Sequence, residues 1–201
     1  RGGSRLQEAA YIKALLGEST GRVQTPTIRS AVSFAASRFR GIAVTDLGPD
    51  NFAEVASARV CRADDPPEVV AKPALFGEVH AFVTHSWRDP AHSKLDELRK
   101  WSMENFPSGS SGASVSAPLV WIDVACLEAG DHSHCKEEEL QCLPFFILGC
   151  RCLLILAGDT YPSRLWCAFE IFVFLKLGKP KNEILMRQLT SHLRVGSENT
   201  L

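Results

Sequence analysis

Short apolar runs alternate with longer amphipathic segments from about residue 78 onward. Three of these runs have the length of a β-strand, and a weaker one follows near the end; they cover residues 80–87, 119–124, 152–156 and 183–186. Runs that are apolar throughout are typical of strands buried on both faces of a parallel sheet. Because helices join them, the pattern predicts an α/β, flavodoxin-like fold, an open parallel sheet with helices on both faces.

The segments between these runs predict helices. Residues 94–105 form the first, with Ser93 as its N-cap and with its charged residues facing outward, namely Asp96, Glu97, Arg99 and Lys100. Residues 136–149 form the second. The third begins after Pro162 and Ser163, which are start signals, and ends at Gly178, a stop signal.

The third predicted helix is apolar nearly all round, which is normal for a buried helix, yet Glu170 lies in its middle. Trp166 precedes Glu170 by one turn and shares its face. Burial makes an unpaired carboxylate costly to ionise, so the pKa of Glu170 should rise. Such a residue has either a chemical task or a cationic partner, for which the candidates are Arg88, Arg164 and Lys176.

Residues 1–67 read as a mainly helical N-terminal extension, and residues 68–201 as the α/β domain. Helical spacing covers residues 5–16 and 27–39, and further helical turns are predicted near residues 51–60, with a short strand at 41–44. The boundary is the run Asp64-Asp65-Pro66-Pro67, because paired prolines and like charges continue neither a helix nor a central strand. The extension contains no motif with an evident chemistry.

Polar residues follow the predicted strands, where an open parallel sheet binds its ligands. After the first strand come Ser86, Trp87, Arg88 and Asp89; the second contributes Asp123 and Cys126; the third contributes Gly158 and Asp159. These residues should gather near the start of the helix that carries Glu170. The sequence therefore predicts a ligand site at this edge.

Composition restricts the class of protein. A formal net charge of -1 offers no electrostatic case for binding nucleic acid. No apolar run reaches the roughly 18 to 20 residues that a membrane span needs. The 7 cysteines are odd in number and several lie in apolar segments, which favours reduced thiols in an intracellular, cytoplasmic protein. The chain opens with Arg1 rather than Met, as a fragment or processed product would.

Three stretches carry a resemblance to a known family. FVTHSWRD at residues 82–89 and LVWID at 119–123 resemble the first and second strands of TIR (Toll/interleukin-1 receptor) domains. SRLWCAFE at residues 163–170 is similar to the Ser-x-x-Trp-Cys-x-x-Glu signature of their third helix. The resemblance covers residues 78–186. A group of uncharacterised protist and algal TIR-like proteins shares the His-Ser-Trp strand and the Arg-Leu-Trp-Cys helix.

The resemblance implies one of two functions. Many TIR domains are assembly modules that self-associate or bind other protein subunits, often in signalling. Others are enzymes that cleave the nicotinamide–ribose bond of NAD, as glycohydrolases or cyclases, and need the signature glutamate. By the same match Glu170 is the catalytic residue, residues 86–89 line the nucleotide side together with Asp123, and Trp166 packs beside the site. NAD is then a substrate, with no permanently bound cofactor.

The chain departs from the family pattern in two places. A long Ser/Gly loop at residues 107–117 follows the first helix. The chain also stops soon after the fourth strand, whereas a complete TIR domain has five strands and a final helix. Either the fold is truncated and capped by the N-terminal extension, or the domain continues beyond Leu201.

Two other chemistries are weaker candidates. A hydrolytic triad of Ser86, His85 and Asp159 is disfavoured, because neighbours on a strand point to opposite faces. A zinc site in the loop after the second strand lacks paired Cys-x-x-Cys spacing, so a solvated loop is the simpler account of its residues, Cys126, His132, His134 and Cys135. We expect no metal.

Overall fold

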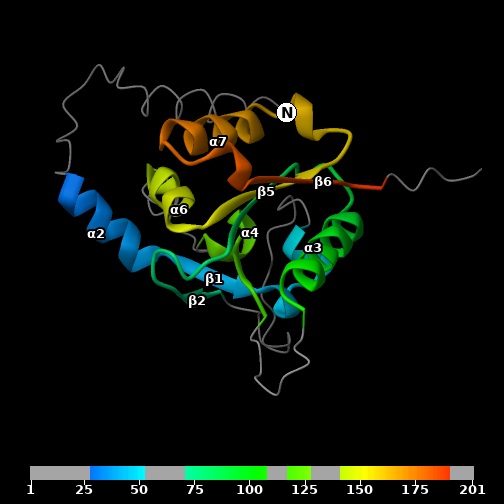
Figure 1. The fold of residues 1–201 in the computed structure, drawn as a ribbon, viewed down its shortest axis with the longest axis horizontal. Coiled ribbons are helices and arrows are strands. Elements are labelled where there is room, and N and C mark those ends of the chain that lie inside the picture. The colour runs from blue at the N-terminus through cyan, green and yellow to red at the C-terminus, as the bar shows by residue number, and fades with distance from the viewer. Residues whose placement is uncertain (1–27, 53–70, 108–116, 128–140, 191–201) are drawn as a thin grey trace, which may run out of the picture.

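A mixed sheet forms the centre of the molecule (Figure 1). The computed structural model describes residues 28–52, 71–107, 117–127 and 141–190. The sheet has six strands in the order β2-β1-β4-β3-β5-β6. They are β1 (Arg40–Ala43), β2 (Lys72–Pro73), β3 (Ala81–His85), β4 (Leu119–Trp121), β5 (Cys152–Ala157) and β6 (Ile184–Gln188).

The four predicted strands form the parallel part of the sheet, which confirms the α/β flavodoxin-like class. β3 lies between β4 and β5 and pairs parallel with both, and β6 pairs parallel with β5. Every residue of β3 is buried, as a continuous apolar run predicts for a central strand. The carboxyl ends of β3, β4 and β5 therefore lie side by side at one edge.

Helices cover both faces of the sheet (Figure 1). α3 (Ala91–Asn105) covers one face, while α6 (Leu143–Gly149) and α7 (Leu165–Lys176) pack together on the other. α2 (Ile28–Arg38) packs against α6, and α4 (Asp123–Cys126) directly follows β4. Short 3-10 turns complete the described elements: η1 (Val44–Asp46), η2 (Pro49–Phe52), η3 (Tyr161–Ser163) and η4 (Lys181–Glu183).

The part of the chain before residue 67 contributes to the same sheet. β1, close to the short strand predicted at 41–44, pairs antiparallel with β4, with Ile42 opposite Val120. β2 pairs antiparallel with β1 at the sheet edge. The sheet is thus mixed, not parallel throughout as predicted. α2 confirms the helix predicted at 27–39, whereas the helix at 5–16, most of that at 51–60 and the boundary at 64–67 lie outside the described residues.

Both predicted serine caps are wrong, because each serine lies inside a helical turn rather than before one. α3 begins at Ala91 directly after Pro90, so Ser93 lies inside the first turn, where its hydroxyl donates to Thr190 O at 3.5 Å. Ser163 closes η3 and donates to Thr160 O at 2.7 Å, and α7 begins at Leu165. The predicted stop is confirmed, since Gly178 has a φ of 76°, which favours glycine.

Two expectations about burial are also wrong. Glu97 is buried rather than turned outward. α7 is not enclosed on all sides, because Leu165, Phe172 and Leu175 are 53%, 45% and 39% exposed. Spaced by seven and three residues, these side chains form one apolar stripe along the helix.

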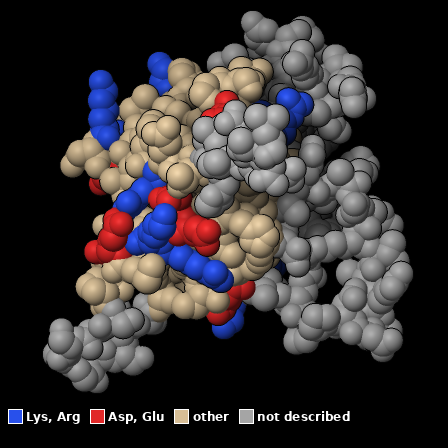
Figure 2. Space-filling view, turned by 90° about the vertical axis from the view of Figure 1, so that its right-hand side faces the viewer, with Lys and Arg blue, Asp and Glu red and all other residues tan. Residues whose placement is uncertain are grey.

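The surface beside α3 carries charges of both signs. Figure 2 shows acidic and basic side chains interspersed on this face. The exposed charged residues of α3 include Asp96, Arg99 and Lys100, and Glu104 of this helix pairs with Arg187 of β6. Among the described residues, no helix has both the length and the apolar character needed to cross a membrane.

Candidate functional site

The candidate site lies at the carboxyl end of β3. Thr84 and His85 are the last residues of this strand, and neighbours on a strand point to opposite faces. His85 contacts Asp123, which begins α4 after β4, whereas Thr84 is hydrogen-bonded to Glu170 of α7. Each face of the strand end thus holds one carboxyl group, of which Glu170 is buried and Asp123 is 13% exposed.

Asp123 is surrounded by hydrogen-bond donors. Its Oδ1 lies 3.2 Å from His85 Nε2 and accepts from the Val124 amide at 2.8 Å, while its Oδ2 accepts from Trp87 Nε1 at 2.8 Å. Burial alone would raise the pKa of Asp123, but these donors and the nearby His85 outweigh it, so the pKa lies below its ordinary value. Asp123 is therefore an ionised carboxylate at neutral pH.

Glu170 is in the opposite state. It is 3% exposed, and its Oε2 has no hydrogen-bond partner within the part of the chain that the structure describes. Burial raises the pKa of Glu170 well above its ordinary value, and the charge of Asp123 raises it further, against the lowering effect of hydrogen bonds with Thr84 and Trp166. The predicted pKa rise is confirmed. An ion-pair partner would instead lower this pKa, so the shift argues against a salt bridge to Glu170.

Thr84 links Glu170 to a second buried hydroxyl. Its Oγ1 lies 3.1 Å from Tyr161 Oη, and burial raises the pKa of Tyr161, which therefore stays protonated. If Thr84 donates to the carboxyl of Glu170, its oxygen accepts from Tyr161. Cys167 lies beside this group, and burial raises the pKa of its thiol to about 12, so it is not a nucleophile.

Ser86 and Asp89 tie the loop after β3 to the loop after β5. Thr160 donates to Asp89 Oδ1 from its amide at 3.0 Å and from its hydroxyl at 2.7 Å, and the same hydroxyl lies 2.7 Å from Ser86 Oγ. A Cβ at Gly158 would stand 2.3 Å from the Asp89 carboxyl carbon, so only glycine permits this approach. Asp89 and Ser86 are buried, and Asp89 Oδ2 has no hydrogen-bond partner.

The structure brings most of the predicted site residues to this edge. Trp87 is 37% exposed and Arg88 is exposed, while Trp166 is half-buried on α7. Ser86, Asp89 and Glu170 are enclosed, so they do not face solvent as an open pocket would require. The half-exposed aromatic and cationic side chains therefore form the accessible part of the site.

The weaker chemistries gain no geometric support. Ser86 Oγ contacts Thr160, His85 contacts Asp123, and Asp159 is exposed, so these residues do not form a triad. The described residues contain no group of three or more metal-binding side chains, and residues 132–135 lie outside them.

Sequence reasoning missed two residues of the site, Lys94 and Thr84. Lys94 is 0% exposed, and its Nζ lies 3.0 Å from Ser86 O and 3.5 Å from His85 Nδ1. The signal was present, because Lys94 precedes the buried Leu98 by one helical turn and so shares its inward face. Thr84 lay within an apolar run, where one hydroxyl gave no sign of a polar partner.

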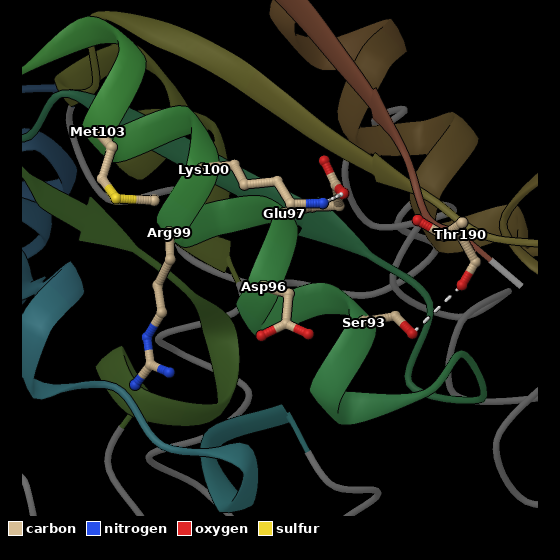
Figure 3. Close-up of a pocket in the computed structure, with 7 residues that line it drawn as sticks. All are labelled: Ser93, Asp96, Glu97, Arg99, Lys100, Met103 and Thr190. Carbon is tan, nitrogen blue, oxygen red and sulfur yellow. Dashed lines mark hydrogen bonds and ion pairs between the residues drawn. The ribbon is translucent and has the colours of Figure 1, made fainter. Parts of the chain in front are cut away.

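A separate cavity of about 350 Å³ lies on the outer side of α3 (Figure 3). Figure 3 shows Ser93 pointing toward Thr190 and Lys100 toward Glu97, with which it forms an ion pair at 2.6 Å. Asp96, Arg99 and Met103 complete the lining. No predicted site residue lines this cavity, and its paired charges leave no clear preference for a ligand of either sign.

The resemblance to TIR domains rests on the motifs quoted above. No family model, curated protein or solved structure matches the chain. The TIR-like stretches therefore remain a resemblance, whose residues meet at the carboxyl edge just described.

Proposed function

We propose that the chain cleaves the nicotinamide–ribose bond of NAD, with Glu170 as the essential carboxyl group. The observation that carries the proposal is the pair of carboxyl groups with opposite pKa shifts at one sheet edge, Asp123 ionised and the buried Glu170 protonated. Environments that drive the pKa values of two neighbouring acids apart are characteristic of acid–base and glycosidic chemistry. The TIR-like signature supports the same assignment of Glu170.

The cationic nicotinamide ring supplies the reason for Glu170 to ionise. A positive charge placed beside a buried neutral carboxyl group lowers its pKa, so binding of NAD releases the proton. The glycosidic bond then breaks with its electron pair moving to the nicotinamide nitrogen, and the carboxylate stabilises the oxocarbenium-like ribose or holds its hydroxyl groups. Water adds to the ribose carbon and loses a proton, which completes hydrolysis.

The accessible residues take the binding roles in this proposal. The half-exposed indoles of Trp87 and Trp166 offer faces on which a nicotinamide or adenine ring stacks. Arg88 is exposed and offers a cation for phosphate. Ser86 and Asp89 hold the edge through Thr160 rather than contacting the substrate. Because Glu170 is 3% exposed, its surroundings must open when NAD binds.

The test is release of free nicotinamide from NAD by the purified chain. We expect Glu170→Gln to reduce release to background, because the amide keeps the size of the side chain but cannot ionise. Glu104→Gln is the matched control, since it makes the same chemical change at an exposed position of α3. A parent chain that releases no nicotinamide, or a Glu170→Gln variant with parental turnover, would overturn the proposal.

A second candidate is a non-catalytic interaction subunit, and the apolar stripe of α7 favours it. Leu165, Phe172 and Leu175 leave a continuous exposed apolar strip that a protein partner or a second copy would cover. In that case Phe172→Lys abolishes association measured by analytical ultracentrifugation, whereas Glu170→Gln leaves it unchanged. Association that survives Phe172→Lys would exclude this face.

A further inference from the structure

Lys94 is a buried cation to which the proposed function gives no role. Its side chain is 0% exposed, although it stands in the first turn of a helix with several exposed charges. Its ammonium donates to Phe52 O at 3.0 Å and to Ser86 O at 3.0 Å. Burial lowers the pKa of Lys94 to about 8, while the charges of Asp89 and Asp123 raise it, so the ammonium form prevails at pH 7.

The contacts of Lys94 determine how His85 is protonated. An ammonium group has only donors, so His85 Nδ1, 3.5 Å away, must be the acceptor. The ring proton of the neutral imidazole then lies on Nε2 and is donated to Asp123 Oδ1 at 3.2 Å. Trp87 Nε1 donates to the other carboxylate oxygen at 2.8 Å. The result is one directed chain from the buried ammonium to the half-exposed indole.

Phe52 connects this series of hydrogen bonds to the N-terminal part of the molecule. Its carbonyl is one of the acceptors of the Lys94 ammonium, and its ring centre lies 5.7 Å from the same nitrogen. The Phe52 ring also meets the His85 ring edge-on, with centroids 5.5 Å apart and an interplanar angle of 69°. Phe52 ends η2, which packs against α3.

We propose that Lys94 is a positioning residue of the candidate site. Seated on the carbonyls of Phe52 and Ser86, its ammonium supplies the buried counter-charge of Asp123 and keeps His85 neutral with its proton on Nε2. This arrangement holds the Asp123 carboxylate and the Trp87 indole in place. A role confined to tying η2 to α3 would not influence the protonation of His85. Only the consequence for turnover rests on the proposed function.

The decisive measurement is the ¹⁵N NMR spectrum of the His85 ring in the full chain at pH 7. In the parent we expect a protonated Nε2 and an unprotonated Nδ1. Lys94→Met keeps the apolar stem and removes the charge, so His85 should take up a proton to balance Asp123, and both ring nitrogens become protonated. The indole N–H signal of Trp87 should move as well. An unchanged His85 ring and Trp87 signal would overturn the proposal.

Lys100→Met is the matched control on the same helix, because Lys100 is exposed and pairs with Glu97. Its His85 and Trp87 signals should stay at their parental positions. If Lys94→Met does not fold, Phe52→Leu replaces it: the main-chain carbonyl remains, but the ring contacts with Lys94 and His85 are lost. Both signals should then move by a smaller amount, and parental signals would overturn the proposal.

The effect on turnover separates this inference from the function itself. If the chain cleaves NAD, Lys94→Met should lower turnover by about 10- to 100-fold, the range found for residues that orient a functional group. A parent chain without NAD cleavage defeats the proposed function, and the His85 spectrum still decides the role of Lys94.

Discussion

Thr84 and His85 are neighbours at the end of β3, yet the two carboxyl groups they serve are in opposite states. On the His85 side, Asp123 receives hydrogen bonds from two side chains and one amide, and a buried ammonium lies behind them. On the Thr84 side, Glu170 has hydrogen bonds with Thr84 and Trp166, and among the described residues its Oε2 has no partner. Burial raises the pKa on both sides.

The comparison shows that the supply of donors, rather than burial, decides which acid ionises. Where enough donors and a cation are provided, the cost of burying the charge is offset and the carboxylate stabilises the fold. Where they are not, the group keeps its proton and the fold holds a neutral acid. Such a group is costly to retain at neutral pH, which is the reason to assign it a task.

The largest expected effect comes from Asp123→Asn. This change keeps the volume but removes one of the two carboxylates, with Asp89, whose charge stabilises the Lys94 ammonium. It also places an amide donor opposite either the Trp87 N–H or the donors that face Oδ1. We expect the free energy of unfolding to fall by about 3 kcal/mol at pH 7, within the range for breaking a buried charge pair. Urea denaturation measures it. Asp96→Asn, on the exposed side of α3, is the control, and a loss no larger than in that control would contradict the comparison.

The loss of unfolding free energy caused by Asp123→Asn should become smaller as the pH falls. The folded-state pKa of Asp123 lies below its ordinary value of 3.8, so the folded state binds this proton less tightly than the unfolded state. Its stabilisation is therefore complete above that pH and is lost as pH falls toward the folded-state pKa. The difference between the parent and Asp123→Asn should shrink over this range.

The strands and the burial of Glu170 could be predicted because both are local properties of the sequence. Continuous apolar runs identify β3, β4 and β5, and an apolar helix around one carboxyl group predicts its raised pKa. The pairing of β1 with β4 could not be read in this way, since Ile42 and Val120 are far apart in sequence and no local pattern records their contact. Nor could the exposed stripe of α7, because a helix that is apolar all round does not indicate which side lacks a neighbour.

The site was predictable as a set of positions but not as a set of partners. The predicted strand ends place Trp87, Asp89 and Asp123 at one edge of the sheet, and these residues lie there in the structure. Which donor meets which acid depends on distances of a few tenths of an ångström between separate elements. The contact of Asp89 with Thr160, made possible by Gly158, is an example. Sequence therefore identified the acids without revealing that one would be ionised and the other not.

The second effect has the opposite sign: Glu170→Gln should stabilise the chain at neutral pH. The folded-state pKa of Glu170 lies above its ordinary value of 4.5, so the folded state binds this proton more tightly, and that advantage is complete below pH 4.5 and lost as pH rises. The unfolded parent gains about 1.4 kcal/mol per pH unit by ionising over this window, and the glutamine variant does not. We expect Glu170→Gln to be more stable than the parent at pH 7, by no more than about 3.5 kcal/mol, which is this slope taken over the interval from pH 4.5 to pH 7.

Urea denaturation of parent and Glu170→Gln at a series of pH values measures this gain. The two curves should meet near pH 4 and separate as pH rises. Glu104→Gln, whose parent side chain lies at the surface, should show no comparable separation. A Glu170→Gln variant that is less stable than the parent at neutral pH would mean that Glu170 is an ionised, paired carboxylate.

The smallest effects come from single donors, and they separate the two sides most cleanly. Tyr161→Phe removes the hydroxyl that reaches Thr84 at 3.1 Å, and Trp87→Phe removes the indole donor of Asp123 at 2.8 Å. Each should cost about 1 kcal/mol, the usual net value of one hydrogen bond. Their pH dependence differs, however. Without its polarising partner Thr84 is a weaker donor, so Tyr161→Phe raises the pKa of Glu170 further and, beyond the constant loss, changes the pH dependence of stability on the alkaline side.

Trp87→Phe acts on the acidic side instead. With one donor fewer, the pKa of Asp123 moves up toward its ordinary value, so less stability remains to be lost as pH falls. Urea midpoints measured from pH 3 to pH 9, roughly the span over which carboxyl groups and buried acids titrate, should show one variant departing from the parental profile at each end. If both variants changed the profile of urea midpoint against pH at the same end, the two carboxyl groups would titrate as a single coupled pair. The division of the β3 end into an ionised and a neutral side would then be wrong.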